Sequence, residues 1–318
     1  SAFIDMLLLE VNKVIIGQKH MIERLLIGLL GCTKSIVFEL PEIEQTIVVE
    51  ATVESGLPPR VILTNSQGYF EAIDSTILSD IFIHDADVVL SDGIESYTLQ
   101  EFNFNGLYIY TSLDFGAIGQ FGKTYSLSIH VNDKNVYSTT TIPQPLFIDS
   151  LWFDKYVAYD SLGLIGARFS DPDTLGNCYR WFAQRINSYT YNYPPPFDNV
   201  KGTIKDSRPL PPIGSSTDDK LFNGLSFDFI FPRRKDGLSD GPDDNNVESG
   251  FYKIGDTILV KSTTTTYPIY LYVRAMENAA ASEGSIFSSP GNLPYNVQGD
   301  GIGIFYGYGV SYDTLICE

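Results

Sequence analysis

Cysteine, histidine and methionine are scarce in this sequence, since each occurs three times in 318 residues. Cys32, Cys178 and Cys317 are too few for a disulfide scaffold, and none of them forms a Cys-x-x-Cys spacing. With so few histidines as well, the sequence argues against a zinc site. No run of about 18 apolar residues or more is present, which argues against a helix that spans a bilayer.

Basic residues are also few. The chain has 21 Lys and Arg against 39 Asp and Glu, which gives a formal net charge of −18. Nucleic acid and anionic lipid bind through clustered Lys and Arg, so this surface repels both. We therefore expect no nucleic-acid partner.

Aromatic residues and glycine are abundant, with 20 Tyr, 20 Phe and 27 Gly. This composition suits strands and turns, and the length allows two domains. Alternating apolar and polar residues, ended by Gly, Pro, Asn or Asp, predict about seven strands in the first half, which is typical of an immunoglobulin-like antiparallel sandwich. The clearest of these strands are residues 47–53, 61–64, 86–90, 107–110, 125–131 and 136–141.

Ile142-Pro-Gln-Pro145 stiffens the chain and predicts a domain boundary, because each proline fixes its own φ and extends the residue before it. The fold class we expect is all-β, with two antiparallel β-sandwich domains after a short helical N-terminal segment. The domains are residues 1–31, 32–145 and 146–318. Strands predicted in the last domain are residues 147–153, 164–169, 178–186, 225–231, 257–262, 269–275 and a final one within 299–309.

Residues 25–32, Leu-Leu-Ile-Gly-Leu-Leu-Gly-Cys, have the pattern of a bacterial lipobox, which predicts lipidation at Cys32 after cleavage of the preceding peptide. Residues 12–31 separately resemble the opening of MoxR-type AAA ATPases, but no P-loop follows them. The segment 1–31 is either foreign or signal-derived, or a genuine pair of amphipathic helices. The sequence favours the first explanation. If Cys32 is acylated, Cys178 and Cys317 remain as a disulfide pair or as two separate buried thiols.

Two long polar segments of the second half hold candidate binding residues. Tyr189, Tyr191, Tyr193 and Phe197 stand beside three prolines, and such rings either contact a partner or ligand or pack back on the domain. Asp236, Asp240, Asp243 and Asp244 supply oxygen ligands for a weakly predicted calcium site. Their spacing is not that of an EF-hand, so a solvated acidic loop is the stronger interpretation. We expect no other cofactor.

Catalytic motifs are missing from the sequence. Gly122-Lys-Thr124 lacks the first glycine of a Walker A loop, and its flanks predict a hairpin turn instead of a helix. No Gly-x-Ser-x-Gly motif is present, and His84 and His130 fall on separate predicted elements with no evident partner. We therefore predict that the protein is not an enzyme.

Residues 32–318 resemble a family of Bacteroidota outer-membrane lipoproteins that carry a domain of unknown function of the DUF4249 type. The residues that carry the resemblance are Cys32, Phe38-Glu-Leu-Pro-Glu42, Val48-Val-Glu50, Gly119, Tyr125-Ser-Leu-Ser-Ile129, Ile142-Pro143, Phe169-Ser-Asp-Pro172, Asn177-Cys-Tyr-Arg180, Gly255-Asp256 and residues 290–305. These motifs are structural and not catalytic.

This resemblance implies a cell-surface or periplasmic location and an accessory role beside a TonB-dependent receptor or another outer-membrane β-barrel. We expect a lipid-anchored binding protein that takes part in nutrient uptake. The alternatives are a surface hydrolase that acts on glycans and a purely structural or adhesive module.

Overall fold

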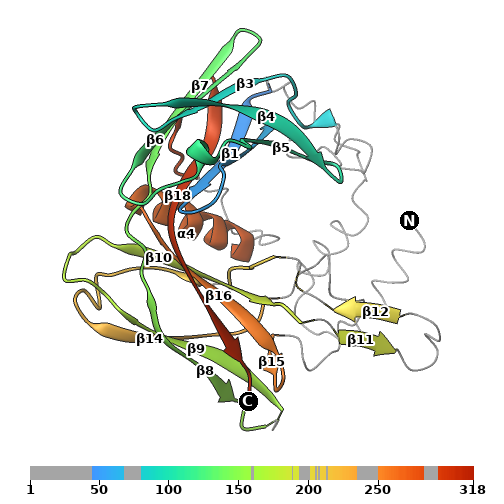
Figure 1. The fold of residues 1–318 in the computed structure, drawn as a ribbon, viewed down its shortest axis with the longest axis vertical. Helices are drawn as coiled ribbons and strands as arrows, with labels where there is room; N and C mark the ends of the chain where they lie inside the picture. The colour runs from blue at the N-terminus through green and yellow to red at the C-terminus, as the bar shows by residue number, and fades with distance from the viewer. Residues whose placement is uncertain are drawn as a thin grey trace, which may run out of the picture. The chain divides into compact units, whose positions relative to one another are not determined.

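A computed structural model gives the structure of the protein. It describes residues 45–67, 80–158, 161–187, 189–192, 201–204, 206, 208–212, 214–234, 250–282 and 293–318, which all belong to one compact unit, Gln45–Glu318 (Figure 1). Across these residues the chain forms eighteen strands and one α-helix. The predicted all-β class is therefore confirmed, with one helix added.

The first half of the unit follows the predicted strands closely. In β6, Tyr125, Leu127, Ile129 and Val131 are buried while the residues between them are exposed. One strand, β4, was not predicted, because its sequence Ser-Tyr-Thr-Leu-Gln-Glu-Phe-Asn-Phe lacks a clear alternation. The elements are β1 (Ile47–Glu54), β2 (Arg60–Asn65), β3 (Asp87–Ser91), β4 (Ser96–Phe104), β5 (Leu107–Thr111), the short 3-10 helix η1 (Phe115–Ala117), β6 (Thr124–Val131) and β7 (Lys134–Thr141).

The turn between β3 and β4 is held by one carboxylate, that of Asp92. Its Oδ1 accepts from the backbone N–H of Glu95 at 2.8 Å and of Ile94 at 3.0 Å, and its Oδ2 accepts from Lys123 Nζ at 2.7 Å. The hydrogen bond from Glu95 is the largest of the effects that hold the pKa of Asp92 well below its ordinary value, and Lys123 adds to it.

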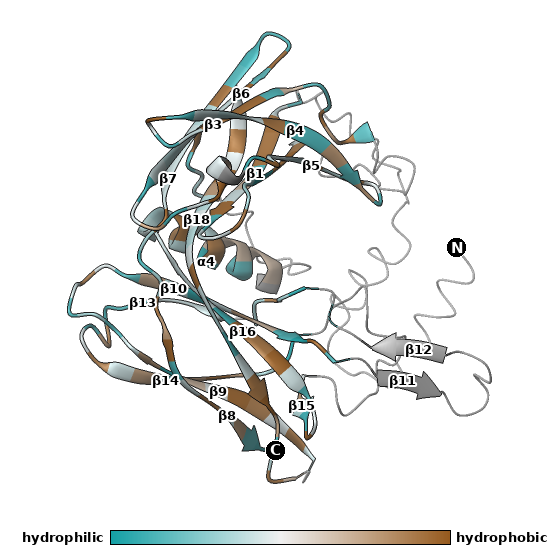
Figure 2. Cartoon of the chain, viewed as in Figure 1, coloured by the Kyte–Doolittle hydropathy of each residue, from teal (hydrophilic) through white to brown (hydrophobic). Residues whose placement is uncertain are grey.

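The second half contains further strands and the helix. Its elements are β8 (Ile148–Lys155), β9 (Leu162–Ser170), β10 (Cys178–Arg185), β11 (Tyr189–Asn192), β12 (Lys201–Ile204), β13 (Ser216–Asp218), β14 (Ser226–Phe231), β15 (Tyr252–Lys253), β16 (Thr257–Thr265), α4 (Tyr267–Ser282), β17 (Val297–Gly299) and β18 (Gly301–Ile316). Figure 2 shows hydrophobic stretches along β9 and β16 and hydrophilic residues at many strand ends.

The helix corrects one prediction. Residues 269–275 were expected to form a strand, but they lie within α4. Ile269 and Val273 are one helical turn apart, and both are buried against β18, so their spacing serves a helix better than a strand. Four alanines between positions 275 and 281 add helix propensity, and Pro268 sits in the first turn, where no backbone donor is needed. Among the described residues, no helix has the length and apolarity to cross a bilayer.

The sixteen-residue strand β18 joins the two halves. Its first half pairs with β1 and its second half with β16, within one twelve-stranded sheet of order β13-β10-β16-β18-β1-β2-β5-β4-β3-β6-β7-β17 (Figure 1). The β1–β18 ladder is parallel, which departs from the predicted antiparallel pairing; the other ladders between described strands are antiparallel. Gly303 has a φ of +134°, and a Cβ there would overlap the carbonyl of Val49. The backbones of β1 and β18 therefore approach closely at this glycine.

Separate apolar clusters fill the two halves. The first lies among β1, β2, β3, β6 and β7, and its fully buried members include Val49, Leu90 and Ile129. The second lies between β9 and β14 on one side and β10 and β16 on the other, around Trp181 and Phe169. The four-stranded sheet of β8, β9, β14 and β15 supplies one wall of the second cluster.

Cys178 and Cys317 are free and buried, so the open alternative resolves to two separate thiols. Cys178 is opposite Thr265 at one end of β16, and Cys317 follows the residue opposite Thr257 at the other end. Eight strand residues separate these ends by roughly 26 Å, far beyond the reach of a disulfide. Burial raises the pKa of each thiol to about 12.

Candidate functional site

Most of the site residues predicted from the sequence lie outside the described residues. These are Cys32, Tyr193, Phe197 and the four aspartates Asp236, Asp240, Asp243 and Asp244. Tyr189 and Tyr191 lie on β11, which pairs with β12, and only their backbone is described. Lipidation, the aromatic contact surface and the calcium site therefore stay predictions.

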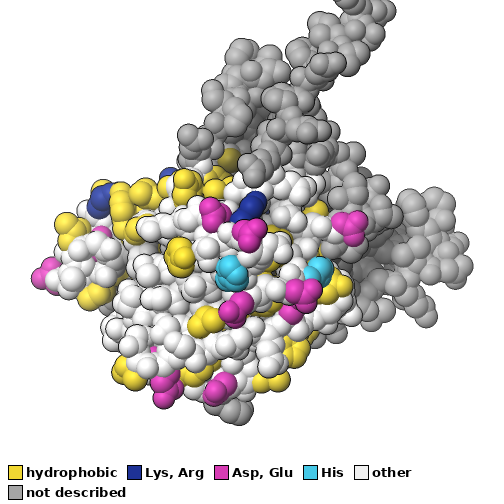
Figure 3. Space-filling view, turned by 90° about the horizontal axis from the view of Figure 1, so that it is seen from above, with side chains coloured by type: hydrophobic (Ala, Val, Ile, Leu, Met, Phe, Trp, Pro, Cys, Tyr) yellow, Lys and Arg dark blue, Asp and Glu magenta, His cyan; other side chains and the backbone are white. Residues whose placement is uncertain are grey.

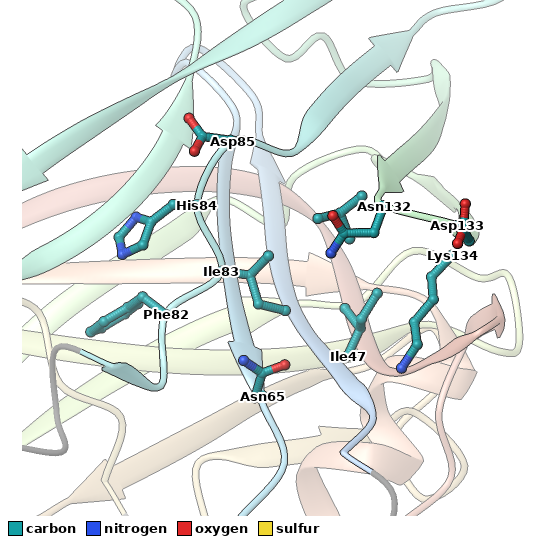
Figure 4. A pocket seen from close by; sticks show the side chains of 10 residues that line it. Ile47, Asn65, Phe82, Ile83, His84, Asp85, Asn132, Asp133 and Lys134 are labelled. Atoms are coloured by element: carbon teal, nitrogen blue, oxygen red, sulfur yellow. The ribbon is translucent and has the colours of Figure 1, made fainter.

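The structure brings other residues together in a pocket of about 490 Å³ in the first half of the unit (Figure 4). Three pieces of chain line it: β1 with the end of β2, the segment before β3, and the turn between β6 and β7. The lining residues are Ile47, Asn65, Phe82, Ile83, His84, Asp85, Val131, Asn132, Asp133 and Lys134.

The segment before β3 is held in place by backbone hydrogen bonds to β2. The N–H of Ile83 donates to the carbonyl of Leu63 at 2.9 Å, and that of Asn65 donates to the carbonyl of Ile81 at 2.8 Å. This extended backbone points successive side chains to opposite sides. Ile83 is accordingly buried, while His84 and Phe82 point the other way (Figure 4).

Two lining residues have a left-handed backbone. Asp85 has φ of 56° and Asn132 has φ of 53°, a conformation in which Asn and Asp are favoured among residues other than glycine. Asn132 begins the two-residue turn that joins β6 to β7, with Val131 and Lys134 paired at its base. The turn thus sets Asn132 toward the pocket (Figure 4).

His84 is oriented by a carboxylate from β4. Its Nδ1 lies 2.5 Å from Glu101 Oε1, and its ring meets Tyr108 edge-on with 4.4 Å between centroids. The Tyr110 hydroxyl lies 3.4 Å from Glu101 Oε2 and donates to the carbonyl of Ile83 at 2.9 Å. Burial raises the pKa of Tyr110, so its hydroxyl stays a donor at neutral pH. His84 therefore does have a partner, which the sequence did not reveal.

The pocket is more acidic than basic. Asp85 and Asp133 contribute carboxylates, and the one ammonium group of the lining, Lys134, donates to the carbonyl of Gln45 at 3.0 Å. Figure 3 shows acidic side chains around the two histidines on one face of the molecule, with few basic ones among them. The polar lining and adjoining rings suit a neutral or cationic polar ligand.

The lining contains no serine or cysteine, and no group of three or more His, Cys, Asp and Glu in the described parts of the chain could hold a metal ion. His130, on β6, has its own partner, because its Nδ1 lies 3.0 Å from Asn135 Oδ1.

A second set of functional-looking groups lies in the core of the other half. Arg185 Nε is 3.0 Å from Asp256 Oδ2, and Arg233 Nη2 is 2.6 Å from Asp206 Oδ1. The backbone N–H of Arg185 also donates to Asp206 Oδ2 at 2.7 Å, so the four side chains form one network, and all are buried. The sequence gives no sign of this pairing, because Arg233 and Asp206 are 27 residues apart.

These four charged residues lie next to the ends of the two long polar segments of the second half. Arg185 and Asp206 flank residues 186–205, and Arg233 and Asp256 flank residues 234–255. The network therefore ties together described residues at both ends of the two segments.

Comparison with known proteins gives one match, to a protein family. No curated protein matches it. Residues 33–314 match the family described as a domain of unknown function, DUF4249, and this match covers the described strands of the twelve-stranded sheet except for the last two residues of β18. The protein is therefore a member of the DUF4249 family.

Proposed function

We propose that the protein is a lipoprotein of a Gram-negative outer membrane, anchored through Cys32, and that it binds its target without catalysing a reaction. One observation carries this proposal: the family match begins at residue 33, directly after the cysteine of Leu-Leu-Gly-Cys. In a lipoprotein the functional domain follows the acylated cysteine, so the lipobox and the family domain fit end to end. The diacyl and N-acyl chains of such an anchor would make attachment durable, since a single chain binds only weakly.

The partner that we propose is a TonB-dependent receptor, with the protein acting as an accessory in nutrient uptake. The resemblance to Bacteroidota lipoproteins supports this partner. The length of the two polar segments of the second half supports it further, because long loops commonly carry binding function. The buried network of Arg185, Asp206, Arg233 and Asp256 lies in the described residues at their ends. We place the pocket around His84 as the first candidate for ligand contact.

The finer description of the fold belongs to the same proposal. Two sandwich domains, residues 32–145 and 146–318, with the first immunoglobulin-like, are supported by the separate apolar clusters of the two halves. The shared strand β18 would then fix the two domains to each other.

Lipid attachment is tested by expressing the full-length protein in a Gram-negative host that is grown with radiolabelled palmitate. The wild type and the neighbouring control Thr33→Ala should both take up label and sediment with outer membranes. Cys32→Ser should lose the label and leave the membrane fraction, because the thiol is the acylation site. Label retained in Cys32→Ser, or absent from the wild type, would contradict the anchor.

The partner is tested by affinity purification of the native protein from detergent-solubilised membranes, followed by mass spectrometry. We expect a TonB-dependent receptor to co-purify in near-equal amount. Recovery with no β-barrel protein would refute the partner while leaving the lipid anchor intact.

A further inference from the structure

A positively charged cluster stands out on the central sheet of this strongly acidic protein. Arg60 on β2, Arg180 on β10 and Lys261 on β16 lie on the sheet face opposite the two apolar clusters. Arg180 and Lys261 lie against the ring of Phe182, and Arg60 lies near Glu54, the carboxylate that pairs with Lys261. We call these three basic residues the cationic cluster. It is separate from the pocket around His84, whose lining it does not share.

The register of the sheet brings the cluster together. Phe182, Lys261 and Tyr312 are directly opposite one another on β10, β16 and β18, so their side chains form one row on the same face. Arg180 Cζ and Lys261 Nζ each lie 5.1 Å from the centroid of the Phe182 ring. Two cations therefore share one ring, which places like charges close together in a half-buried setting.

One carboxylate in direct contact balances the cluster. Glu54 on β1 is 2.7 Å from Lys261 Nζ and 3.8 Å from Arg60 Nη2. Among the described residues, Arg180 forms no ion pair, and its Nε atom is buried with no hydrogen-bond partner. Glu50, the next acid along this face of β1, is exposed. Three cations thus face one close carboxylate and one solvated one.

The pKa of Lys261 responds to its burial and to the charges around it. Burial is the largest effect and lowers the pKa of Lys261, Glu54 opposes it, and the charges of Arg60 and Arg180 add smaller lowering effects. A ligand anion at Arg180 would reduce the repulsion between the two cations that share Phe182.

We propose that the cationic cluster binds the carboxylate of a small organic acid, with Arg180 as its main contact. The planar guanidinium matches a carboxylate through two parallel hydrogen bonds. Phe182, which packs against the buried ring of Tyr308, and the half-exposed Tyr312 provide an apolar surface for the body of the acid. A singly charged carboxylate fits better than phosphate, because desolvation costs rise steeply with charge. This inference does not depend on the lipid anchor or on the transporter.

The test measures thermal unfolding of the full-length protein against rising benzoate at constant ionic strength, with calorimetric titration as the second readout. Benzamide, which has the same shape and no charge, is the ligand control, and inorganic phosphate is the comparison anion. A ligand that binds the folded state raises Tm as its concentration passes its Kd, so benzoate at about ten times its Kd should raise Tm by a few degrees.

The decisive variant is Arg180→Gln, with Arg180→Lys and Arg60→Gln beside it. Arg180→Gln should weaken benzoate binding at least about tenfold, because it removes a charge-assisted pair of hydrogen bonds. Arg180→Lys keeps the charge but cannot form two parallel hydrogen bonds, so it should bind benzoate with an affinity between those of Arg180→Gln and the wild type. Arg60→Gln, whose side chain is 59 % exposed, folds in either case and should weaken binding about twofold or more.

The matched control is Lys155→Gln, an exposed lysine at the end of β8 in the other sheet, which makes the same charge change and should bind benzoate as the wild type does. Equal benzoate binding by Arg180→Gln and the wild type would overturn the proposal. So would an equal effect of benzamide, a response to phosphate alone, or no response to benzoate.

Discussion

The buried charge network of the second half allows a sharp stability prediction. The side chains of Arg185 and Asp256 are 2 % and 0 % exposed, and their Nε and Oδ2 atoms are 3.0 Å apart. Arg185→Met keeps most of the volume of the side chain but removes its charge. The carboxylates of Asp206 and Asp256 then share one cation fewer in the core. Breaking a buried pair in this way costs about 3–5 kcal/mol, a large part of the roughly 5–15 kcal/mol that stabilises a typical protein.

The assay is equilibrium unfolding in urea, followed by circular dichroism, for the wild type, Arg185→Met, Asp256→Asn and the double variant. Arg185→Met should lower the urea midpoint by about 1 M or more. The double variant should lose less than the sum of the two single losses, by about 1–3 kcal/mol, because the second change removes the charge that the first left uncompensated.

The control is Arg168→Met on the surface. Arg168 forms two hydrogen bonds of 2.7 Å to Asp228, so its local geometry is as good as that of the buried pair, but both side chains are about half exposed. Solvent already screens this pair, so the variant should unfold close to the wild-type midpoint. A loss in Arg168→Met equal to that in Arg185→Met, or strictly additive losses in the buried cycle, would refute the argument from burial.

Three further predictions concern a glycine, an aspartate and the two buried cysteines. Gly303→Ala should destabilise the protein by about 2 kcal/mol or more in the same urea assay, because the added Cβ meets the carbonyl of Val49. A smaller loss would contradict a close contact between these two backbones. Asp92 has a lowered pKa, so its stabilising effect is complete above about pH 4 and is lost as the pH falls below that. Asp92→Asn should therefore show a smaller fall in the free energy of unfolding below about pH 4 than the wild type does. An equal fall in both proteins would contradict the turn geometry. Cys178 and Cys317, with thiol pKa values of about 12, should resist iodoacetamide at pH 8 until urea unfolds the chain; rapid labelling of the native protein would show that they are accessible.

Local pattern was enough to predict much of the fold. The strict alternation of Tyr125, Leu127, Ile129 and Val131 located β6, and the final strand predicted within residues 299–309 overlaps β18. The helix α4 was missed because its apolar run from Ile269 to Val273 is short enough for either element, and only its burial against β18 decides between them.

Pairing between distant residues could not be predicted in the same way. His84 meets Glu101 only because β4, which has no strong strand signal, passes beside it. The parallel β1–β18 ladder joins segments about 250 residues apart, and no local pattern records such a partner. Arg180 and Lys261 likewise come together only through the register of β10 and β16.

The central claim, a binding protein attached to the membrane through Cys32, is tested most directly by the intact mass of the native protein purified from its membrane. We expect a chain that begins at Cys32 and carries the added mass of its acyl groups. A mass of 35.4 kDa, which corresponds to all 318 residues with an unmodified thiol, would contradict both the anchor and the location that follows from it.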